Sequence, residues 1–160
     1  MSPLTFDSLC PEPSRLEKAK LSRAGRFSLL VLAFALAGVL GVARWLEPDR
    51  RGYGTHEQFG LPPCAFRVLT GIPCPACGLT TSFAYAARGQ VANAAGANFA
   101  GCLLAFGVAA VVPWCLVSAV VGRTVGIRSP ERATMTAVLA FLAIDLAGWL
   151  VRFLFFRGQG

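Results

Sequence analysis

The chain has 160 residues, of which 55% are hydrophobic and only 14% are charged, and its formal net charge at pH 7 is +7. One small globule cannot bury so much apolar surface, and soluble proteins carry about 25% charged residues, so the composition argues against a water-soluble domain. No nucleic-acid-binding module accompanies the positive charge, which membrane topology and anionic lipid headgroups explain better. We therefore expect the lipid bilayer, and not nucleic acid, to be the main partner, with other membrane proteins as further candidates.

The chain begins with a basic tail, residues 1–26, which we expect to be poorly ordered, and residues 27–160 are expected to form a single membrane domain. Residues 27–43 are an uncharged apolar run that, as a helix, nearly covers the roughly 30 Å hydrocarbon core of a bilayer. This run predicts a first transmembrane helix. A cleavable signal peptide is the alternative, because the run ends in a small-x-small pattern at 41–43. We favour a retained anchor, since the basic lead is long and the remainder of the chain is itself apolar.

Residues 44–98 form a long connecting segment that contains Cys64, Cys74 and Cys77. Prolines flank Cys74 and keep the chain extended there, and Gly78 can adopt the left-handed conformation that a tight turn requires. Apolar residues at helical spacing then predict a short helix of about ten residues. Because this helix is too short to span a bilayer, we expect an amphipathic or re-entrant helix whose N-terminal dipole favours thiolates at Cys74 and Cys77.

Two further apolar runs predict the second and third transmembrane helices. Residues 99–121 are uncharged and contain Pro113, an internal break that membrane helices tolerate. Residues 133–151 carry Trp149 near one end as an interfacial anchor. The expected fold class is therefore an all-α integral membrane protein with about three transmembrane helices and one short helix after a cysteine-containing loop.

Basic residues favour one orientation of these spans. The tail before the first span is basic, and the loop between the second and third spans carries Arg123, Arg128 and Arg132. Positively charged segments of this kind are enriched on the cytoplasmic side, which predicts that both lie there and that residues 44–98 face outward. We expect the protein to reside in a bacterial cytoplasmic membrane with its N-terminus in the cytoplasm.

Asp145 is the only charged residue inside the third span. A carboxylate at this depth costs roughly 2.5 to 3.5 kcal/mol unless it is neutralised or paired, so it should face the bundle interior. Arg152 lies two turns further on and could reach toward it. Either Asp145 fixes helix packing, or it handles a proton or a substrate and is then a candidate catalytic residue.

Three interpretations of the cysteines remain open at this point. In the first, Cys64, Cys74 and Cys77 bind a metal, most naturally zinc, with His56 as the candidate fourth ligand. In the second, Cys74 and Cys77 form a catalytic C-x-x-C dithiol that passes electrons to a quinone. In the third, the thiols are structural, either as a disulfide between Cys64 and one partner or as buried free cysteines.

The run PPCAFRVLTGIPCPACGLTTSFAYAARGQ resembles the signature of a membrane-protein family called domain of unknown function 2752. Members of this family carry a C-P-x-C-G-[LM]-T core that follows an upstream cysteine and an L-T-G step, and the likeness extends over about residues 60–105. The chain departs from the pattern at Thr81, where many relatives have arginine, and at Asn98-Phe99, where they have Asn-Pro. If the family arginine binds an anion, this protein lacks that contact.

The resemblance implies a small multi-pass membrane protein whose cysteine loop is the functional part, but it supplies no reaction. We therefore expect a loop that is structural or metal-binding and acts in membrane assembly or recognition. The alternative is a membrane thiol/disulfide oxidoreductase that uses Cys74 and Cys77. Whether the protein is an enzyme stays open at this stage.

Overall fold

The computed structural model describes residues 20–125 and 130–157, and over these ranges all regular secondary structure is helical. The elements in chain order are α2 (Arg23–Trp45), the 3₁₀ helix η2 (Thr55–Phe59), α3 (Ala65–Thr70), α4 (Leu79–Ala86), α5 (Val91–Ala97), α6 (Phe99–Val121) and α7 (Pro130–Arg157). Residues 1–19 of the basic tail and Arg128 lie outside the described residues.

Three of these helices, α2, α6 and α7, are long and apolar enough to cross a membrane. Only 11%, 22% and 0% of their most apolar windows are buried inside the protein, respectively. Apolar helices whose side chains face outward need lipid around them. The predicted fold class, an all-α membrane protein with three spans, is therefore confirmed.

The helix ends explain how far the predicted spans extend. Ser22 caps α2 by accepting a hydrogen bond from the backbone N–H of Gly25, so the helix takes in the arginines at 23 and 26 that the sequence suggested for the tail. The second span matches its prediction at both ends, because Asn98 caps the start of α6 and Gly122 (φ 76°) ends it. The third span is longer than predicted at both ends.

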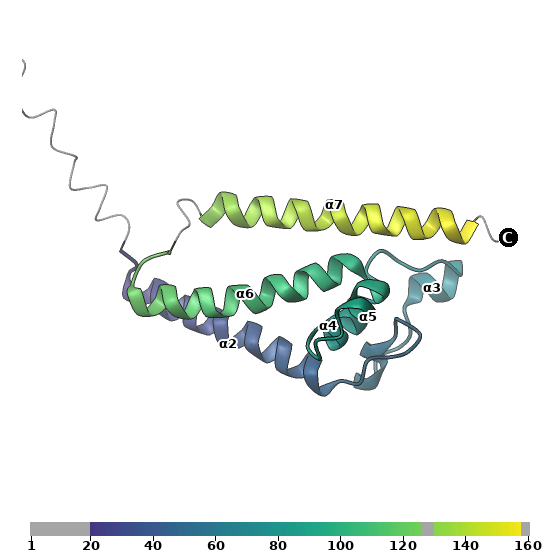
Figure 1. Cartoon of the computed structure of the whole chain (residues 1–160), viewed down its shortest axis with the longest axis horizontal. Helices are drawn as coiled ribbons and strands as arrows, with labels where there is room; N and C mark the ends of the chain where they lie inside the picture. Colours follow the sequence, from purple (N-terminus) through teal and green to yellow (C-terminus); the bar gives the residue numbers. More distant parts are fainter. Residues whose placement is uncertain (1–19, 126–129, 158–160) are drawn as a thin grey trace, which may run out of the picture.

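α2 and α6 form the main helix pair and diverge toward the end that carries α3, α4 and α5 (Figure 1). The α4–α5 hairpin fills the space between the diverging helices, where Phe83 of α4 packs against Ala43 of α2 and Ala105 of α6. Four consecutive residues of α4, Thr81 to Ala84, are buried. The predicted short helix is thus present, and it is wedged into the bundle rather than laid on its surface.

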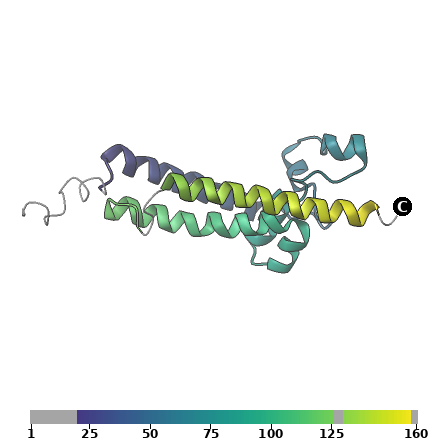
Figure 2. The ribbon, with the colours of Figure 1, turned by 90° about the horizontal axis from the view of Figure 1, so that it is seen from above.

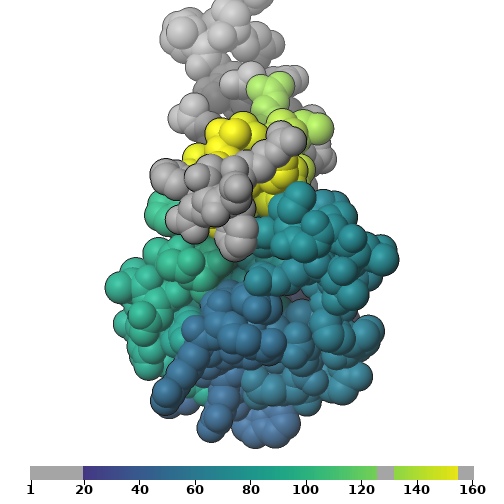
Figure 3. Space-filling view, turned by 90° about the vertical axis from the view of Figure 1, so that its right-hand side faces the viewer, coloured from purple at the N-terminus to yellow at the C-terminus, as the bar shows by residue number. Residues whose placement is uncertain are grey.

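α7 runs over the α2–α6 pair, and its backbone lies closest to that of α6 (Figures 1 and 2). The C-terminal ends of α2 and α7 and the start of α6 point toward the same end of the molecule (Figure 1). The segment between α2 and α6 forms much of the surface there (Figure 3). We call this the cysteine end. At the opposite end, the backbone N–H of Leu21 donates to the carbonyl of Gly122 at 2.7 Å, so the start of α2 and the end of α6 lie together.

Candidate metal centre

The cysteine loop, residues 73–78, is a tight turn that leads into α4. The backbone N–H of Cys77 donates to the carbonyl of Cys74 at 3.0 Å, and the N–H of Leu79 donates to Ala76 at 3.1 Å. Gly78 (φ 86°) then caps α4. Because Cys64 is the N-cap of α3, two helix N-termini bring their cysteines to one place.

Gly78 is the residue that allows this turn to fit against the rest of the cysteine end. A Cβ atom built on it would overlap the carbonyl oxygen of Ala97 and would lie 2.7 Å from the carbonyl oxygen of Gly52. Its positive φ also lies in a region that other L-residues rarely adopt. The cysteine loop is therefore packed directly against the backbone at Ala97 and at Gly52.

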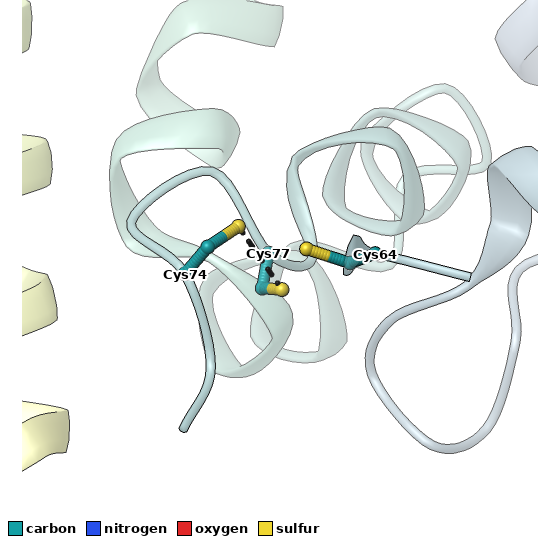
Figure 4. Close-up of side chains that lie close together, drawn as sticks. All are labelled: Cys64, Cys74 and Cys77. Carbon is teal, nitrogen blue, oxygen red and sulfur yellow. Dashed lines mark hydrogen bonds between the residues drawn. The ribbon is translucent and has the colours of Figure 1, made fainter. Parts of the chain in front are cut away.

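The sulfur atoms of Cys64, Cys74 and Cys77 converge, and all lie within 4.8 Å of one another (Figure 4). Within this cluster, which we call the thiol triad, the Sγ of Cys74 lies 3.2 Å from the Sγ of Cys77. Three thiolates on a tetrahedral zinc, with Zn–S bonds of about 2.3 Å, lie about 3.8 Å from one another. The triad is thus close to the spacing that one metal ion requires.

The local environment shifts the pKa values of Cys64 and Cys74 in opposite directions. The backbone N–H of Arg67 at the start of α3 hydrogen-bonds the Cys64 sulfur and lowers the pKa of that thiol. Burial, followed by the neighbouring thiols Cys77 and Cys64, raises the pKa of Cys74 to about 12. A metal ion placed between the sulfurs would displace these protons, because only thiolates are strong ligands.

A cavity of about 470 Å³ opens beside the triad, and all three cysteines line it. His56 lines it too, but its ring nitrogens are outside the group of ligand atoms that lie within 4.8 Å of one another. On another wall, the Arg67 guanidinium stacks 3.6 Å from the ring centroid of Tyr53. The described structure therefore brings together three of the four predicted metal ligands and places the fourth in the same cavity.

Residues 64–112 match the family described as "Protein of unknown function (DUF2752)". We call this matched part of the chain the DUF2752 segment. The family suggested by the cysteine run is therefore confirmed, with a match that begins at Cys64 and reaches the middle of α6. No curated protein and no solved structure matches the chain.

The DUF2752 segment is held at its cysteine loop by three side chains whose role the sequence did not reveal. Trp149 donates from its indole nitrogen to the carbonyl of Pro73 at 2.7 Å. Arg152 donates to the carbonyls of Pro75 and Cys77, each at 3.3 Å. The Asn98 side-chain amide donates to the same two carbonyls at 3.4 and 3.3 Å. Two of these three residues belong to α7, outside the matched segment.

The expected pairing of Arg152 with Asp145 is wrong. No salt bridge within 4.0 Å joins these two described residues, because the guanidinium of Arg152 is directed at backbone carbonyls of the loop and of Ala97. Asp145 instead accepts a hydrogen bond from the Asn98 amide at 3.4 Å. It lines a second, smaller cavity of about 190 Å³ and not the cavity beside the thiol triad.

The remaining described cysteines are separate from the triad. Cys102 and Cys115 lie in α6 and are buried. All five described cysteines are free thiols, and Cys10 lies outside the described residues. Cys102 and Cys115 therefore provide natural controls for experiments on Cys64, Cys74 and Cys77.

Proposed function

We propose that the protein is an integral membrane metal–thiolate protein in which Cys64, Cys74 and Cys77 bind one soft divalent ion, with zinc as the expected metal. The observation that carries this proposal is the convergence of three sulfur atoms within 4.8 Å from two separate helix N-termini. Thiolate ligands select zinc and other soft metals over magnesium or calcium.

The metal would act as a structural tie at the cysteine end. It would join α3 to the start of α4, two described helices whose backbones do not pack against each other. A closed zinc site has four ligands, and His56, which lines the same cavity, is the protein's candidate for the fourth. The tied segment between α2 and α6 would then be a folded surface for recognition or assembly with other membrane proteins.

The experiment that tests the metal proposal is elemental analysis of the purified full-length protein. We expect about one zinc ion per chain, and we expect the Cys64→Ser, Cys74→Ser and Cys77→Ser variants each to lose it. Cys102→Ala and Cys115→Ala are matched controls that should keep the metal. A metal-free wild-type protein that remains metal-free after incubation with zinc under reducing conditions would refute the proposal.

The contribution of His56 is tested separately. If the imidazole is the fourth ligand, His56→Ala should weaken zinc binding while leaving three sulfur ligands on the ion. Unchanged zinc affinity in His56→Ala would remove histidine from the ligand set and leave the fourth position to water or to a ligand from outside the chain.

A thiol/disulfide oxidoreductase is the second candidate, favoured by the 3.2 Å separation of the Cys74 and Cys77 sulfurs. In that reaction the two thiols would form one disulfide and release two protons and two electrons to a quinone-class acceptor, which becomes the quinol. Cys64 distinguishes the two functions, because a C-x-x-C dithiol needs only Cys74 and Cys77. A Cys64→Ser variant that keeps quinone-dependent turnover would favour the enzyme, whereas one that loses bound metal would favour the metal site.

We further propose that the N-terminus lies in the cytoplasm of a bacterial cell and that the cysteine end faces outward. Arg26 and Arg123 flank the opposite end of the bundle, where the start of α2 and the end of α6 lie together, which agrees with the preference of positive charge for the cytoplasmic side. Labelling of intact cells with a membrane-impermeant reagent tests this orientation. In a variant whose six native cysteines are replaced by serine, a cysteine introduced at Gly60, in the segment between α2 and α6, should react from outside. Its failure to react until the cells are lysed would contradict this orientation.

A further inference from the structure

The cysteine loop has little hydrogen bonding of its own. Pro73 and Pro75 have no N–H to donate, and the backbone bonds inside the loop are those of the turn at Cys77 and Leu79. The carbonyls of Pro73, Pro75 and Cys77 are therefore satisfied from elsewhere, by side chains that come from the start of α6 and the end of α7.

α7 supplies the strongest of these contacts from far along the chain. Trp149 lies 76 positions after Pro73, and Arg152 lies 77 positions after Pro75 and 75 after Cys77. Hydrogen bonds from a charged donor such as the Arg152 guanidinium are stronger than those from a neutral donor. Trp149 is itself held by stacking on Phe153, with ring centroids 5.5 Å apart.

α7 buries little of its apolar surface against the bundle. Its most apolar window is 0% buried, its backbone lies closest to that of α6, and Arg152 also donates to the last carbonyl of α5, that of Ala97. The contacts of Trp149 and Arg152 with the cysteine loop therefore form a large part of what docks α7 at this end. The same contacts fix the backbone on which Cys74 and Cys77 stand.

We propose that Trp149 and Arg152 are positioning residues of the thiol triad and that α7 acts as a clamp on the cysteine loop. This inference rests on the proposed metal site and extends it. The clamp holds the Cys74 and Cys77 backbone so that their sulfurs stay converged on Cys64. When α7 is displaced, the carbonyls of Pro73, Pro75 and Cys77 lose the donors that Trp149 and Arg152 supply. The sulfurs then separate and the metal is released more readily. Metal retention is thereby coupled to the position of a transmembrane helix.

The test measures metal release from the full-length protein in detergent, loaded with cobalt(II) so that the thiolate-to-cobalt absorption reports the sulfur ligands directly. The variants are Trp149→Phe, which keeps the ring and removes the indole N–H, and Arg152→Met, which keeps the side-chain length and removes the donors. Residues that support metal ligands typically alter metal affinity by about 10- to 100-fold, so we expect release to a chelator to accelerate by about that factor. Arg152→Lys keeps a charged donor and should restore part of the loss.

The matched control is Leu150→Ala, which lies on α7 between the two positioning residues and whose side chain is 49% exposed. It should release cobalt at the wild-type rate. If Trp149→Phe and Arg152→Met remain helical and monodisperse but also release cobalt at the wild-type rate, the clamp is wrong. If Arg152→Met does not fold, the comparison of Arg152→Lys and Trp149→Phe with Leu150→Ala decides by the same criterion.

Failure of the metal site and failure of the clamp give different results. If the wild-type protein shows no thiolate-to-cobalt absorption, the metal proposal fails. The clamp is then tested by hydrogen exchange of the metal-free protein at the amides of Cys77 and Leu79, which report the turn itself. Faster exchange there in Trp149→Phe than in Leu150→Ala supports the clamp, and equal exchange overturns it.

Discussion

Gly78→Ala is expected to be the most damaging single-methyl change at the cysteine end. The residue has φ 86°, and an added Cβ would overlap the Ala97 carbonyl oxygen and approach the Gly52 oxygen to 2.7 Å. A left-handed conformation costs a non-glycine residue roughly 1 to 2 kcal/mol, and an overpacked contact adds about 1 to 3 kcal/mol. The sum, about 2 to 5 kcal/mol, corresponds to a fall in Tm of about 4 to 20 °C for a chain of this size.

The control for this prediction is Gly89→Ala. Gly89 has a similarly positive φ of 73°, but nothing lies within 4 Å of the position that a Cβ atom would occupy. Gly89→Ala should therefore lower the free energy of unfolding only by the cost of the left-handed backbone conformation, about 1 to 2 kcal/mol. The assay is thermal unfolding in detergent followed by tryptophan fluorescence, with zinc content measured on the same samples. We expect Gly78→Ala to melt below Gly89→Ala and to retain less metal. Equal melting temperatures would refute the close packing of the cysteine loop against the backbone.

Three further outcomes follow from the same structure. In metal-free protein, alkylation by iodoacetamide needs the thiolate. Cys64, whose pKa is lowered by the Arg67 N–H, should therefore react at lower pH than Cys74, whose pKa burial raises to about 12. Mass spectrometry of the alkylated peptides over a pH series gives the order, and earlier reaction of Cys74 would contradict it. Ser82→Ala removes a buried hydroxyl that donates to the carbonyls of Ala94 and Asn98, and it should lower the free energy of unfolding by about 1 to 3 kcal/mol. Ser28→Ala, at an exposed position, is the control and should leave the melting temperature unchanged. Arg26→Met removes hydrogen bonds to the carbonyls of Ala119 and Val120 near the end of α6, at 2.7 and 2.6 Å. The variant should have a lower Tm and an unchanged zinc content. A loss of zinc would contradict this and show that the two ends of the bundle are coupled.

The sequence predicted the parts of the fold that hydrophobic runs determine. The uncharged run between the capping residues Asn98 and Gly122 defines both ends of α6. α2 begins before its apolar run because its first turn contains arginines and is capped by Ser22. The convergence of Cys74 and Cys77 follows from local spacing, since three residues and a glycine turn suffice to bring them together. The approach of Cys64 depends on the path of the chain through α3, which spacing alone does not specify.

The supporting side chains were beyond the reach of sequence patterns for a physical reason. Trp149 at the end of an apolar span is typical of an interfacial anchor, and Arg152 two turns after Asp145 is typical of an ion pair. Both expectations follow from the position of these residues in an apolar helix. The carbonyls that they actually bind belong to residues 73–77, about 75 positions earlier in the chain, and no local pattern indicates that pairing. Prolines at 73 and 75 were a usable signal, because a loop poor in its own N–H donors, and packed against helices, needs donors from elsewhere.

The most direct test of the account is X-ray absorption spectroscopy at the zinc edge on the purified wild-type protein. The proposal that Cys64, Cys74 and Cys77 share one ion predicts three sulfur neighbours at about 2.3 Å and one lighter neighbour at about 2.0 to 2.2 Å. A first shell of nitrogen and oxygen alone, or a protein that takes up no zinc when reduced, would contradict the metal centre.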